Sequence, residues 1–239
     1  MSDVTIGVTA FLRYPRLVQA LKGIAHFFPE CQSIVASDGN ENIPSHKGTS
    51  IHMVFDSGLC AKRNAIVGCT KTKYLLMCSD DYEFASARSG VEKMKAVLDR
   101  HAALDVAGGR VNGRLYEGFL DYHPGSHIRE IRLRENYNYN VEFYRCDITA
   151  NYFLARTNRL LPWPEELKIG GEHAYWFLKM KQAGALTCYV PDANIDTQQH
   201  AETPDPAYVA YRRRAYEGHR RMKEMLDIKT YVDFDGRES

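Results

Sequence analysis

The sequence predicts an α/β domain with a mostly parallel central sheet, helices on both faces of that sheet and a further helix at the C-terminal end. Short apolar runs rich in β-branched residues alternate with segments that carry apolar residues at helical spacing, which indicates strands joined by helical crossovers. A length of 239 residues suits one such domain. The hydrophobic fraction of 44% and the charged fraction of 26% exclude a disordered, collagenous or membrane-embedded chain.

Local signals divide the first half of the chain into these elements. Pro15 stands near the start of the first expected helix, and apolar residues follow it at helical spacing, at Leu17, Leu21, Ile24 and Phe28. β-branched and apolar runs that end in acidic residues or glycine predict the strands. In chain order, we expect strands over residues 4–13, 32–39, 50–56, 73–81 and 104–111, and helices over residues 14–28, 58–70 and 89–101.

The second half of the chain is less regular. Residues 112–157 are rich in Tyr, Arg and Asn and predict a hairpin or twisted strands. A Pro-rich turn and the pair Gly170 and Gly171 precede another helix, and a last strand is expected over residues 186–196. Asp192 to Pro206 has the composition of a loop, and Ala207 to Leu226 that of a C-terminal helix. The sequence contains no linker that would mark a domain boundary.

Polar residues follow several of the predicted parallel strands. In such sheets the ligand crevice lies outside the carboxyl ends of the strands. Residues at that edge are therefore candidates for a binding site: Thr9, Phe11, Asp38, Asp80 and Asp81.

The stretch LLMCSDDYEF, residues 75–84, places Asp80 and Asp81 side by side at the end of an apolar run. Two interpretations are open. Acidic residues commonly end strands and begin turns, because their side chains bond the nearby backbone. Alternatively, a divalent cation holds the two carboxylates together and leaves coordination positions for phosphate oxygens.

Charge is uneven along the chain, although the formal net charge of +1 identifies no partner. Residues 211–223 place six arginine and lysine side chains within a little over three helical turns. A solvated helix face is one interpretation, and contact with a diphosphate or polyanion is the other.

The six cysteines form no CxxC pair, and their apolar surroundings are typical of small buried side chains in a reducing compartment. No apolar run approaches the roughly 20 residues that a membrane span needs, and the first residues lead directly into a strand without a signal peptide. We therefore expect a cytoplasmic protein with no membrane span.

Six ordered segments together carry a family resemblance. They are residues 4–17, 34–39, 61–84, 104–111, 167–184 and 207–226. In these segments the chain resembles the family 2 type nucleotide-sugar glycosyltransferases with the GT-A fold, and most closely the subgroup containing the GM2/GD2 synthase-type β-1,4-N-acetylgalactosaminyltransferases. The resemblance implies a single GT-A domain over residues 1–239. Its parts would be a nucleotide-sugar-binding half (1–111), an acceptor-binding half (112–206) and a C-terminal helix and tail (207–239).

The resemblance also implies a donor site. Residues at the end of the first strand would lie against the nucleotide, and the acidic residue after the second strand would contact the uracil or ribose. Two residues of the triplet KRN would approach the diphosphate or the donor sugar, and an arginine of the tail would close over the diphosphate. The implied donor-binding residues are Thr9, Phe11, Arg13, Asp38, Arg63, Asn64, Asp80 and Arg212.

A metal site is implied at the acidic pair. Asp81 would contact the ion, although Ser79 stands where the family commonly has an aspartate. A divalent cation neutralises charge that develops on a nucleoside diphosphate leaving group, and hard oxygen ligands favour Mn²⁺ or Mg²⁺. His200 follows the last strand, where related enzymes often place a metal-binding histidine; a solvated loop histidine is the alternative.

Glu172 is the expected general base, and His173 is the second candidate. The family places its catalytic carboxylate at this glycine-flanked helix start, and an attacking hydroxyl needs a base within reach. The alternative role for Glu172 is an electrostatic interaction with the helix dipole.

The resemblance therefore implies an inverting, metal-dependent transfer of a sugar from a nucleotide-sugar donor, expected to be a UDP-sugar, to a hydroxyl of a glycan acceptor. Two alternatives remain open at this stage. One is a transferase that acts on a hydroxymethylated base in phage-type DNA, which the clustered arginines favour and the near-zero net charge opposes. The other is a nucleotide-sugar-binding module without catalysis.

Overall fold

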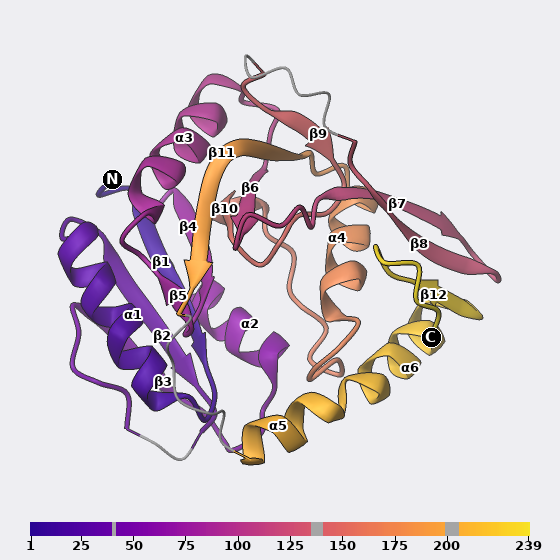
Figure 1. Cartoon of the computed structure of the whole chain (residues 1–239), viewed down its shortest axis with the longest axis horizontal. Coiled ribbons are helices and arrows are strands. Elements are labelled where there is room, and N and C mark those ends of the chain that lie inside the picture. Colours follow the sequence, from indigo (N-terminus) through magenta and orange to yellow (C-terminus); the bar gives the residue numbers. More distant parts are fainter. Residues whose placement is uncertain (40–41, 135–140, 199–205) are drawn as a thin grey trace.

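A large mixed sheet forms the centre of the molecule (Figure 1). The computed structural model describes residues 1–39, 42–134, 141–198 and 206–239. Within these ranges, no helix combines the length and the apolar character needed to cross a lipid bilayer. The strands are β1 (Val4–Ala10), β2 (Gln32–Ser37), β3 (Gly48–His52), β4 (Tyr74–Ser79), β5 (Tyr82–Glu83), β6 (Val106–Val111), β7 (Gly118–His123), β8 (His127–Arg132), β9 (Tyr144–Cys146), β10 (Phe153–Arg156), β11 (Thr187–Thr197) and β12 (Thr230–Val232). The helices are α1 (Tyr14–Phe27), α2 (Leu59–Cys69), α3 (Ala87–Arg100), α4 (Glu172–Gln182), α5 (Pro206–Arg213) and α6 (Ala215–Leu226).

The order of the strands determines where the site lies. The sheet runs β3-β2-β1-β4-β10-β6-β11-β5, and β9 pairs with β11 outside this path. β1 pairs in parallel with both β2 and β4, and β6 pairs in parallel with β11, whereas β10 is antiparallel to both of its neighbours. The predicted α/β fold with a mostly parallel sheet is confirmed. The carboxyl ends of β1, β2 and β4 therefore meet at one edge.

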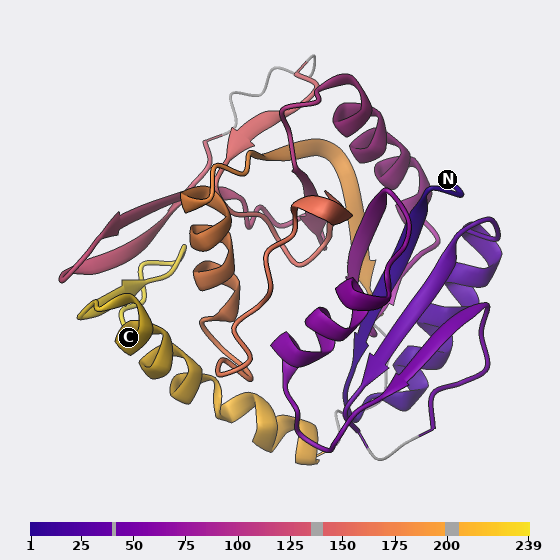
Figure 2. The ribbon, with the colours of Figure 1, turned by 180° about the vertical axis from the view of Figure 1, so that it is seen from behind.

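Two cores form because successive side chains of a strand point to opposite faces. In β4, Leu76 and Cys78 belong to the core that α1 and α3 cover, whereas Leu75 and Met77 belong to the core of α2 and α4. Figures 1 and 2 show α1 and α3 on one side of the sheet and α2 on the other. At Gly7, a Cβ would lie 2.6 Å from the side chain of Ile66, so a glycine is needed for α2 to pack this closely.

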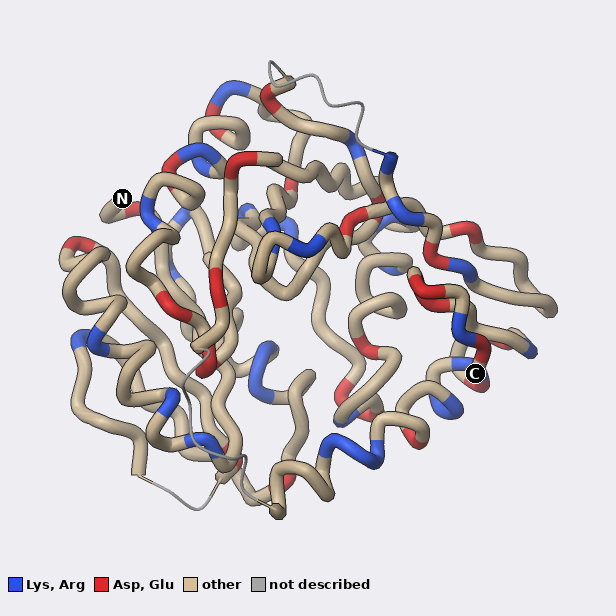
Figure 3. Tube along the Cα trace, viewed as in Figure 1, with Lys and Arg blue, Asp and Glu red and all other residues tan. Residues whose placement is uncertain are grey.

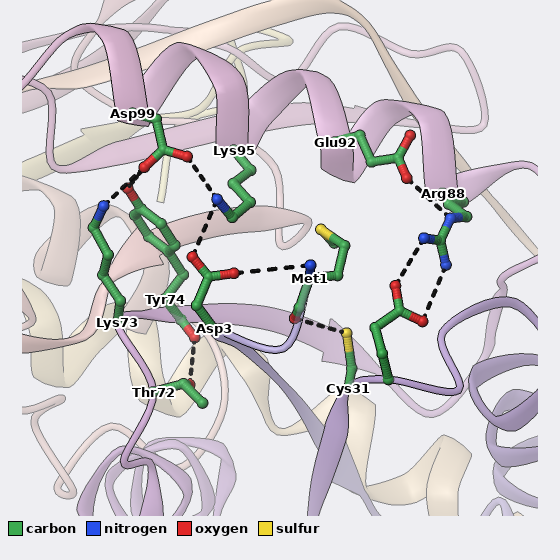
Figure 4. Close-up of polar contacts among 11 residues, drawn as sticks. Met1, Asp3, Cys31, Thr72, Lys73, Tyr74, Arg88, Glu92, Lys95 and Asp99 are labelled. Carbon is green, nitrogen blue, oxygen red and sulfur yellow. Dashed lines mark hydrogen bonds and ion pairs between the residues drawn. The ribbon is translucent and has the colours of Figure 1, made fainter.

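Ion pairs fasten α3 at the amino-terminal end of β1 and β4 (Figure 4). Asp99 on α3 accepts hydrogen bonds from Lys73 and Lys95, and from the hydroxyl of Tyr74 at 2.7 Å. These hydrogen bonds, led by that from Lys73, lower the pKa of Asp99 well below its usual range. At the other end of α3, Arg88 pairs with Glu30 at 2.7 Å. Polar contacts thus hold α3 against the sheet, away from the ligand crevice.

The last strand predicted over residues 186–196 is confirmed as β11. The overlapping prediction of a loop from Asp192 is wrong for residues 192–197, which belong to this strand. The register of β11 against β6 shifts between Tyr189 and Asn194, and the strand resumes pairing after this irregularity and then pairs with β5. A bulge of this kind lets a strand pass a proline, here Pro191, without ending.

The C-terminal segment also differs from the prediction. The single helix expected over residues 207–226 is two helices, α5 and α6, with a break at Arg214. After the break, Gly218 lets α6 cross the loop before α4 at close range, since a Cβ there would lie 2.0 Å from the carbonyl oxygen of Ile169. The unpredicted strand β12 follows α6 and pairs in parallel with β8 of the hairpin β7–β8. The predicted hairpin in the second half is confirmed.

Glu117, the residue before β7, provides a test of this packing. It is fully buried, its Oε2 has no partner among the described residues, and burial raises its pKa to about 8. The pKa of Glu117 is higher in the folded state than in the unfolded state, so the folded state is favoured most when Glu117 is protonated. Its contribution to the free energy of unfolding is therefore fully present below about pH 4.5 and is lost as pH rises through about 8. We expect Glu117→Gln to raise the free energy of unfolding by about 4 kcal/mol at pH 8.5 and by much less at pH 5.

Urea unfolding of both proteins at the two pH values measures this difference. Glu83 is exposed, and Glu83→Gln serves as the matched control. We expect this variant to show no pH-dependent rise in the free energy of unfolding. An equal gain for Glu117→Gln at both pH values would contradict the assignment of a protonated, buried Glu117.

Candidate functional site

A pocket lies at the carboxyl ends of β1 and β4, where the sequence predicts the ligand crevice. Its volume is about 330 Å³, within the range of small-molecule sites, and residues of β1, α2, β4 and α5 line much of it. The fold thus brings together segments that are far apart in the sequence. Six residues predicted for the site line the pocket: Thr9, Phe11, Arg13, Arg63, Asp81 and Arg212.

Arginine side chains neutralise the adjacent carboxylates Asp80 and Asp81. Asp80 is fully buried behind the pocket, where its carboxylate accepts hydrogen bonds from Arg13 and, at 3.3 Å, from the backbone N–H of Phe11. Asp81 lines the pocket and pairs with Arg13 at 2.7 Å and with Arg16 at 3.7 Å. The guanidinium between the two carboxylates offsets the repulsion between their charges.

The charges of this group depend on one another. Burial raises the pKa of Asp80 to about 6, and the Arg13 guanidinium opposes that rise. Burial also lowers the pKa of Arg13, but Asp80 and Asp81 outweigh this effect and keep it above its ordinary value. The Arg13–Asp80 ion pair is therefore formed at neutral pH.

A second buried ion pair joins Asp38 to Lys62. Asp38 is fully buried, and its carboxylate accepts hydrogen bonds from Lys62 and from the backbone N–H of Gly58 at 2.8 Å. Gly58 has a φ of 98°, and a Cβ there would lie 2.8 Å from the backbone of Lys168, so the position requires glycine. Lys62 lines the pocket in front of Asp38. The predicted contact between Asp38 and the nucleotide stays a prediction, and it requires Lys62 to move or to share the ligand.

Arg63 is a buried cation whose hydrogen-bonding capacity is only partly used. Its exposed fraction is 3%, Nη2 donates to Asn151 at 2.6 Å, and its guanidinium lies 5.4 Å from the ring of Trp163. Within the described part of the chain, Nε and Nη1 have no hydrogen-bond partner. A buried charge with unsatisfied donors is costly unless a ligand pairs with it. Arg63 and Asn151 both line the pocket, so an anionic ligand bound there would lie next to this guanidinium.

Aromatic side chains and cations of α5 complete the pocket. Tyr211 packs on Phe11 with ring centroids 4.6 Å apart, and Tyr208 lies over the guanidinium of Arg13 at 4.6 Å. Arg212, on the same helix, lines the pocket. Figure 3 shows basic positions in blue at the start of α2 and at the end of α5. The pocket combines a stacking surface with positive charge, as a nucleotide phosphate requires.

Glu172 and His173 begin α4 beside the pocket but are not part of its lining. Glu172 is 7% exposed and has neither a hydrogen bond nor an ion pair with any described residue. It contributes to the raised pKa of Tyr211 after burial and two aspartates, which indicates that its carboxylate lies near the lining. Nε2 of His173 donates to the carbonyl oxygen of Thr149, and burial lowers the pKa of His173 to about 4, so this imidazole is neutral at pH 7.

Two further predicted residues are not placed in the pocket. The side chain of Asn64 bonds the backbone of Trp163 through both its oxygen and its nitrogen, and it also donates to Glu165 at 2.9 Å. This side chain positions the loop before α4, and its contact with the donor stays a prediction. His200 lies outside the described residues.

The sequence alone did not identify several of the residues that line the pocket. Lys62 belongs to the KRN triplet, and its basic character was a usable signal. Tyr208 and Tyr211 precede the arginine run at a spacing that places them on one helix face. Asn151 gave no signal, because it belongs to the irregular second half. The lining residues that were not predicted include Lys62, Asn151, Tyr208 and Tyr211.

Sequence comparisons identify related proteins. Beta-1,4 N-acetylgalactosaminyltransferase 1 of Rattus norvegicus is 34% identical over 170 residues, which are 66% of this chain and 32% of the relative. The protein of the same name from Mus musculus is 29% identical over 232 residues, which are 90% of this chain and 43% of the relative. The chain thus spans less than half of the length of each of these relatives. No family model matches the chain.

Solved structures share the fold at low sequence identity. GalNAc-T7 with UDP, GalNAc and Mn²⁺ has a TM-score of 0.62 at 12% identity, over 86% of this chain and 45% of that one. The mannosyltransferase PcManGT from Pyrobaculum calidifontis, in complex with GDP-Man and Mn²⁺, has a TM-score of 0.63 at 12% identity. The match covers 93% of this chain and 63% of that one. TarS 1-349 of S. aureus, in complex with UDP-GlcNAc, has a TM-score of 0.57 at 15% identity. The match covers 84% of this chain and 60% of that one.

These comparisons confirm two predictions. The chain has the GT-A fold of nucleotide-sugar glycosyltransferases, and in sequence it resembles the β-1,4-N-acetylgalactosaminyltransferases. Glycosyltransferase is the enzyme class that the names of the relatives and of these structural neighbours share. The comparisons do not favour the DNA-modifying alternative or the inactive binding module.

Proposed function

We propose that this GT-A chain is a glycosyltransferase domain that moves a sugar from a nucleotide sugar to a hydroxyl group of a glycan acceptor. The observation that carries the proposal is the buried guanidinium of Arg63, whose Nε and Nη1 have no partner among the described residues and which lines the pocket. A donor diphosphate supplies the anion that these N–H groups need. The names of the sequence relatives and structural neighbours support this class of ligand.

The proposed donor is a UDP-N-acetylhexosamine. The curated relatives are named as N-acetylgalactosaminyltransferases, and two of the structural neighbours are described with UDP and GalNAc or with UDP-GlcNAc. In this chain, the ring of Phe11 and the hydroxyl of Thr9 would contact the nucleoside part, since both line the pocket close to Asp81. Arg63 and Arg212 would then bind the diphosphate.

A divalent cation, Mn²⁺ or Mg²⁺, fits the donor set of this pocket. The ligand that the chain would offer is the Asp81 carboxylate, a hard oxygen donor that is partly exposed in the pocket, and such ions often take one or two carboxylates together with phosphate oxygens and water. When bound, the ion would supply charge neutralisation for the diphosphate leaving group. Asp81 would have to exchange one of its arginine partners for the ion, while Asp80 stays paired with Arg13.

Glu172 is the proposed general base of an inverting, single-displacement reaction. Its buried carboxylate has no partner in the described part of the chain and is therefore free to accept the proton of an acceptor hydroxyl. Nε2 of His173 is held by the carbonyl of Thr149, so His173 is less suited to this role. As the bond from the anomeric carbon to the phosphate breaks, Arg63 and Arg212 would stabilise the negative charge that develops on the diphosphate.

A donor screen tests the proposed function. The purified chain is incubated with UDP-, GDP- and CMP-sugars, with and without Mn²⁺, and release of free nucleotide is followed. We expect metal-dependent release from a UDP-N-acetylhexosamine and its loss in Asp81→Ala. If no donor is hydrolysed or transferred and calorimetry detects no nucleotide binding, the proposed function is wrong.

A further inference from the structure

A group of three metal-ligating side chains lies at the tip of the β7–β8 hairpin, outside the donor pocket. Asp121 and His123 are two residues apart on β7, so they point to the same face, and His127 on β8 is the cross-strand partner of His123. Nε2 of His123 lies 3.0 Å from one Asp121 oxygen, and Nε2 of His127 lies 3.7 Å from the other. All three ligand atoms lie within 4.8 Å of one another.

These separations are close to the spacing that a zinc ion requires. Tetrahedral zinc with bonds of about 2.0–2.1 Å to imidazole nitrogen and carboxylate oxygen keeps its ligand atoms about 3.3 Å apart. The separations from the two imidazole nitrogens, 3.0 Å to Oδ1 and 3.7 Å to Oδ2 of Asp121, lie on either side of that value, and a shared ligand oxygen requires the carboxylate to rotate. Small side-chain rotations would therefore complete a three-ligand site that leaves one position for water.

A neighbouring hydroxyl orients one of the imidazoles. The Oγ of Ser126 lies 2.9 Å from Nδ1 of His127, while Nε2 of the same ring faces Asp121. When Nδ1 carries the proton and donates to Ser126, Nε2 holds the lone pair that a metal takes. A hydrogen bond to the second ring nitrogen is the usual support of a metal-binding histidine.

The backbone around the tip is held in place by the C-terminal segment. The N–H of Gly125 donates to the carbonyl of Asp227 at 2.8 Å, and the N–H of Lys229 donates to that of Ser126 at 2.8 Å. The hydroxyl of Tyr122 donates to the carbonyl of Leu226 at 3.0 Å. The ligands therefore stand on a braced hairpin, which lowers the entropy lost on metal binding.

We propose that Asp121, His123 and His127 form a zinc-binding site that clamps the two strands of the hairpin and is independent of the donor pocket. Two imidazoles and one carboxylate favour Zn²⁺ over the Mn²⁺ or Mg²⁺ proposed for the donor site. Arg129 lies opposite Asp121 in the strand register, so its positive charge opposes the cation and limits the affinity. The competing explanation is that protonated histidines only pair with Asp121.

Calorimetric titration of the chelator-treated, tag-free chain with ZnCl₂ tests the site. We expect one Zn²⁺ per chain, affinity at least 10-fold weaker in His123→Ala and in His127→Ala, and tighter binding in Arg129→Gln. The exposed residues His52 and Cys69 provide matched controls, and His52→Ala and Cys69→Ser should bind Zn²⁺ as the parent chain does.

A rise in Tm on addition of Zn²⁺, but not of Mn²⁺ or Mg²⁺, should accompany binding in the parent chain and be absent from the two histidine variants. The Tm values without metal show whether each variant is folded. The absence of stoichiometric binding, or equal binding by the parent chain and both histidine variants, would overturn the proposal.

Discussion

Glu172→Gln is expected to lower kcat by about 10²–10⁴-fold while KM for the donor changes little. The substitution keeps the size and polarity of the side chain but removes its capacity to accept the acceptor proton. Because Glu172 has no hydrogen-bond or ion-pair partner among the described residues, replacing it with a neutral amide breaks no contact with them. Steady-state kinetics with the donor identified in the screen measure the effect.

The exposed Glu166→Gln, six residues earlier on the loop before α4, is the matched control and should leave kcat unchanged. Thermal unfolding of both variants establishes that they are folded. A Glu172→Gln variant that keeps kcat within threefold of the parent would contradict the assignment. A large loss in His173→Gln together with that result would transfer the role of base to His173.

Arg63→Met is expected to separate stability from donor binding. The substitution removes a buried charge that lacks two partners within the described residues, and it loses the hydrogen bond to Asn151 and the contact with Trp163. Because burying the guanidinium costs more than these contacts return, we expect the free energy of unfolding to rise by about 1 kcal/mol. The same substitution removes the proposed diphosphate contact and should weaken UDP binding by about 100-fold.

Urea unfolding and calorimetry with UDP measure the two effects. Arg221→Met, on the exposed face of α6, is the matched control and should alter neither quantity by much. If Arg63 has only a structural role, Arg63→Met should instead lower the free energy of unfolding, and the folded protein should bind UDP normally.

Periodicity in the sequence was sufficient for the main architecture. The apolar runs that became β1, β2 and β4 and the helices between them carried clear signals, and their parallel order follows from the crossover connections. β10 could not be placed in this way. It is four residues long, lies in the irregular second half and inserts antiparallel between β4 and β6, an arrangement that depends on pairing between distant segments.

The acidic pair shows how far the candidate site could be predicted. The sequence identified Asp80, Asp81 and Arg13 as members of one site, but not that they contact each other. The contact arises because β1 and β4 are parallel neighbours with Thr9 opposite Ser79, which brings the residues after each strand together. Similarly, the unsatisfied nitrogens of Arg63 depend on side chains from α2, Asn151 and the loop before α4, and no local pattern encodes them.

A crystal structure of the chain with UDP and Mn²⁺ tests the proposed donor site most directly. We predict UDP in the pocket between Phe11 and Asp81, with a phosphate oxygen about 3 Å from Nε or Nη1 of Arg63. UDP bound at another place, or bound in the pocket while Nε and Nη1 of Arg63 stay without an anionic partner, would contradict it.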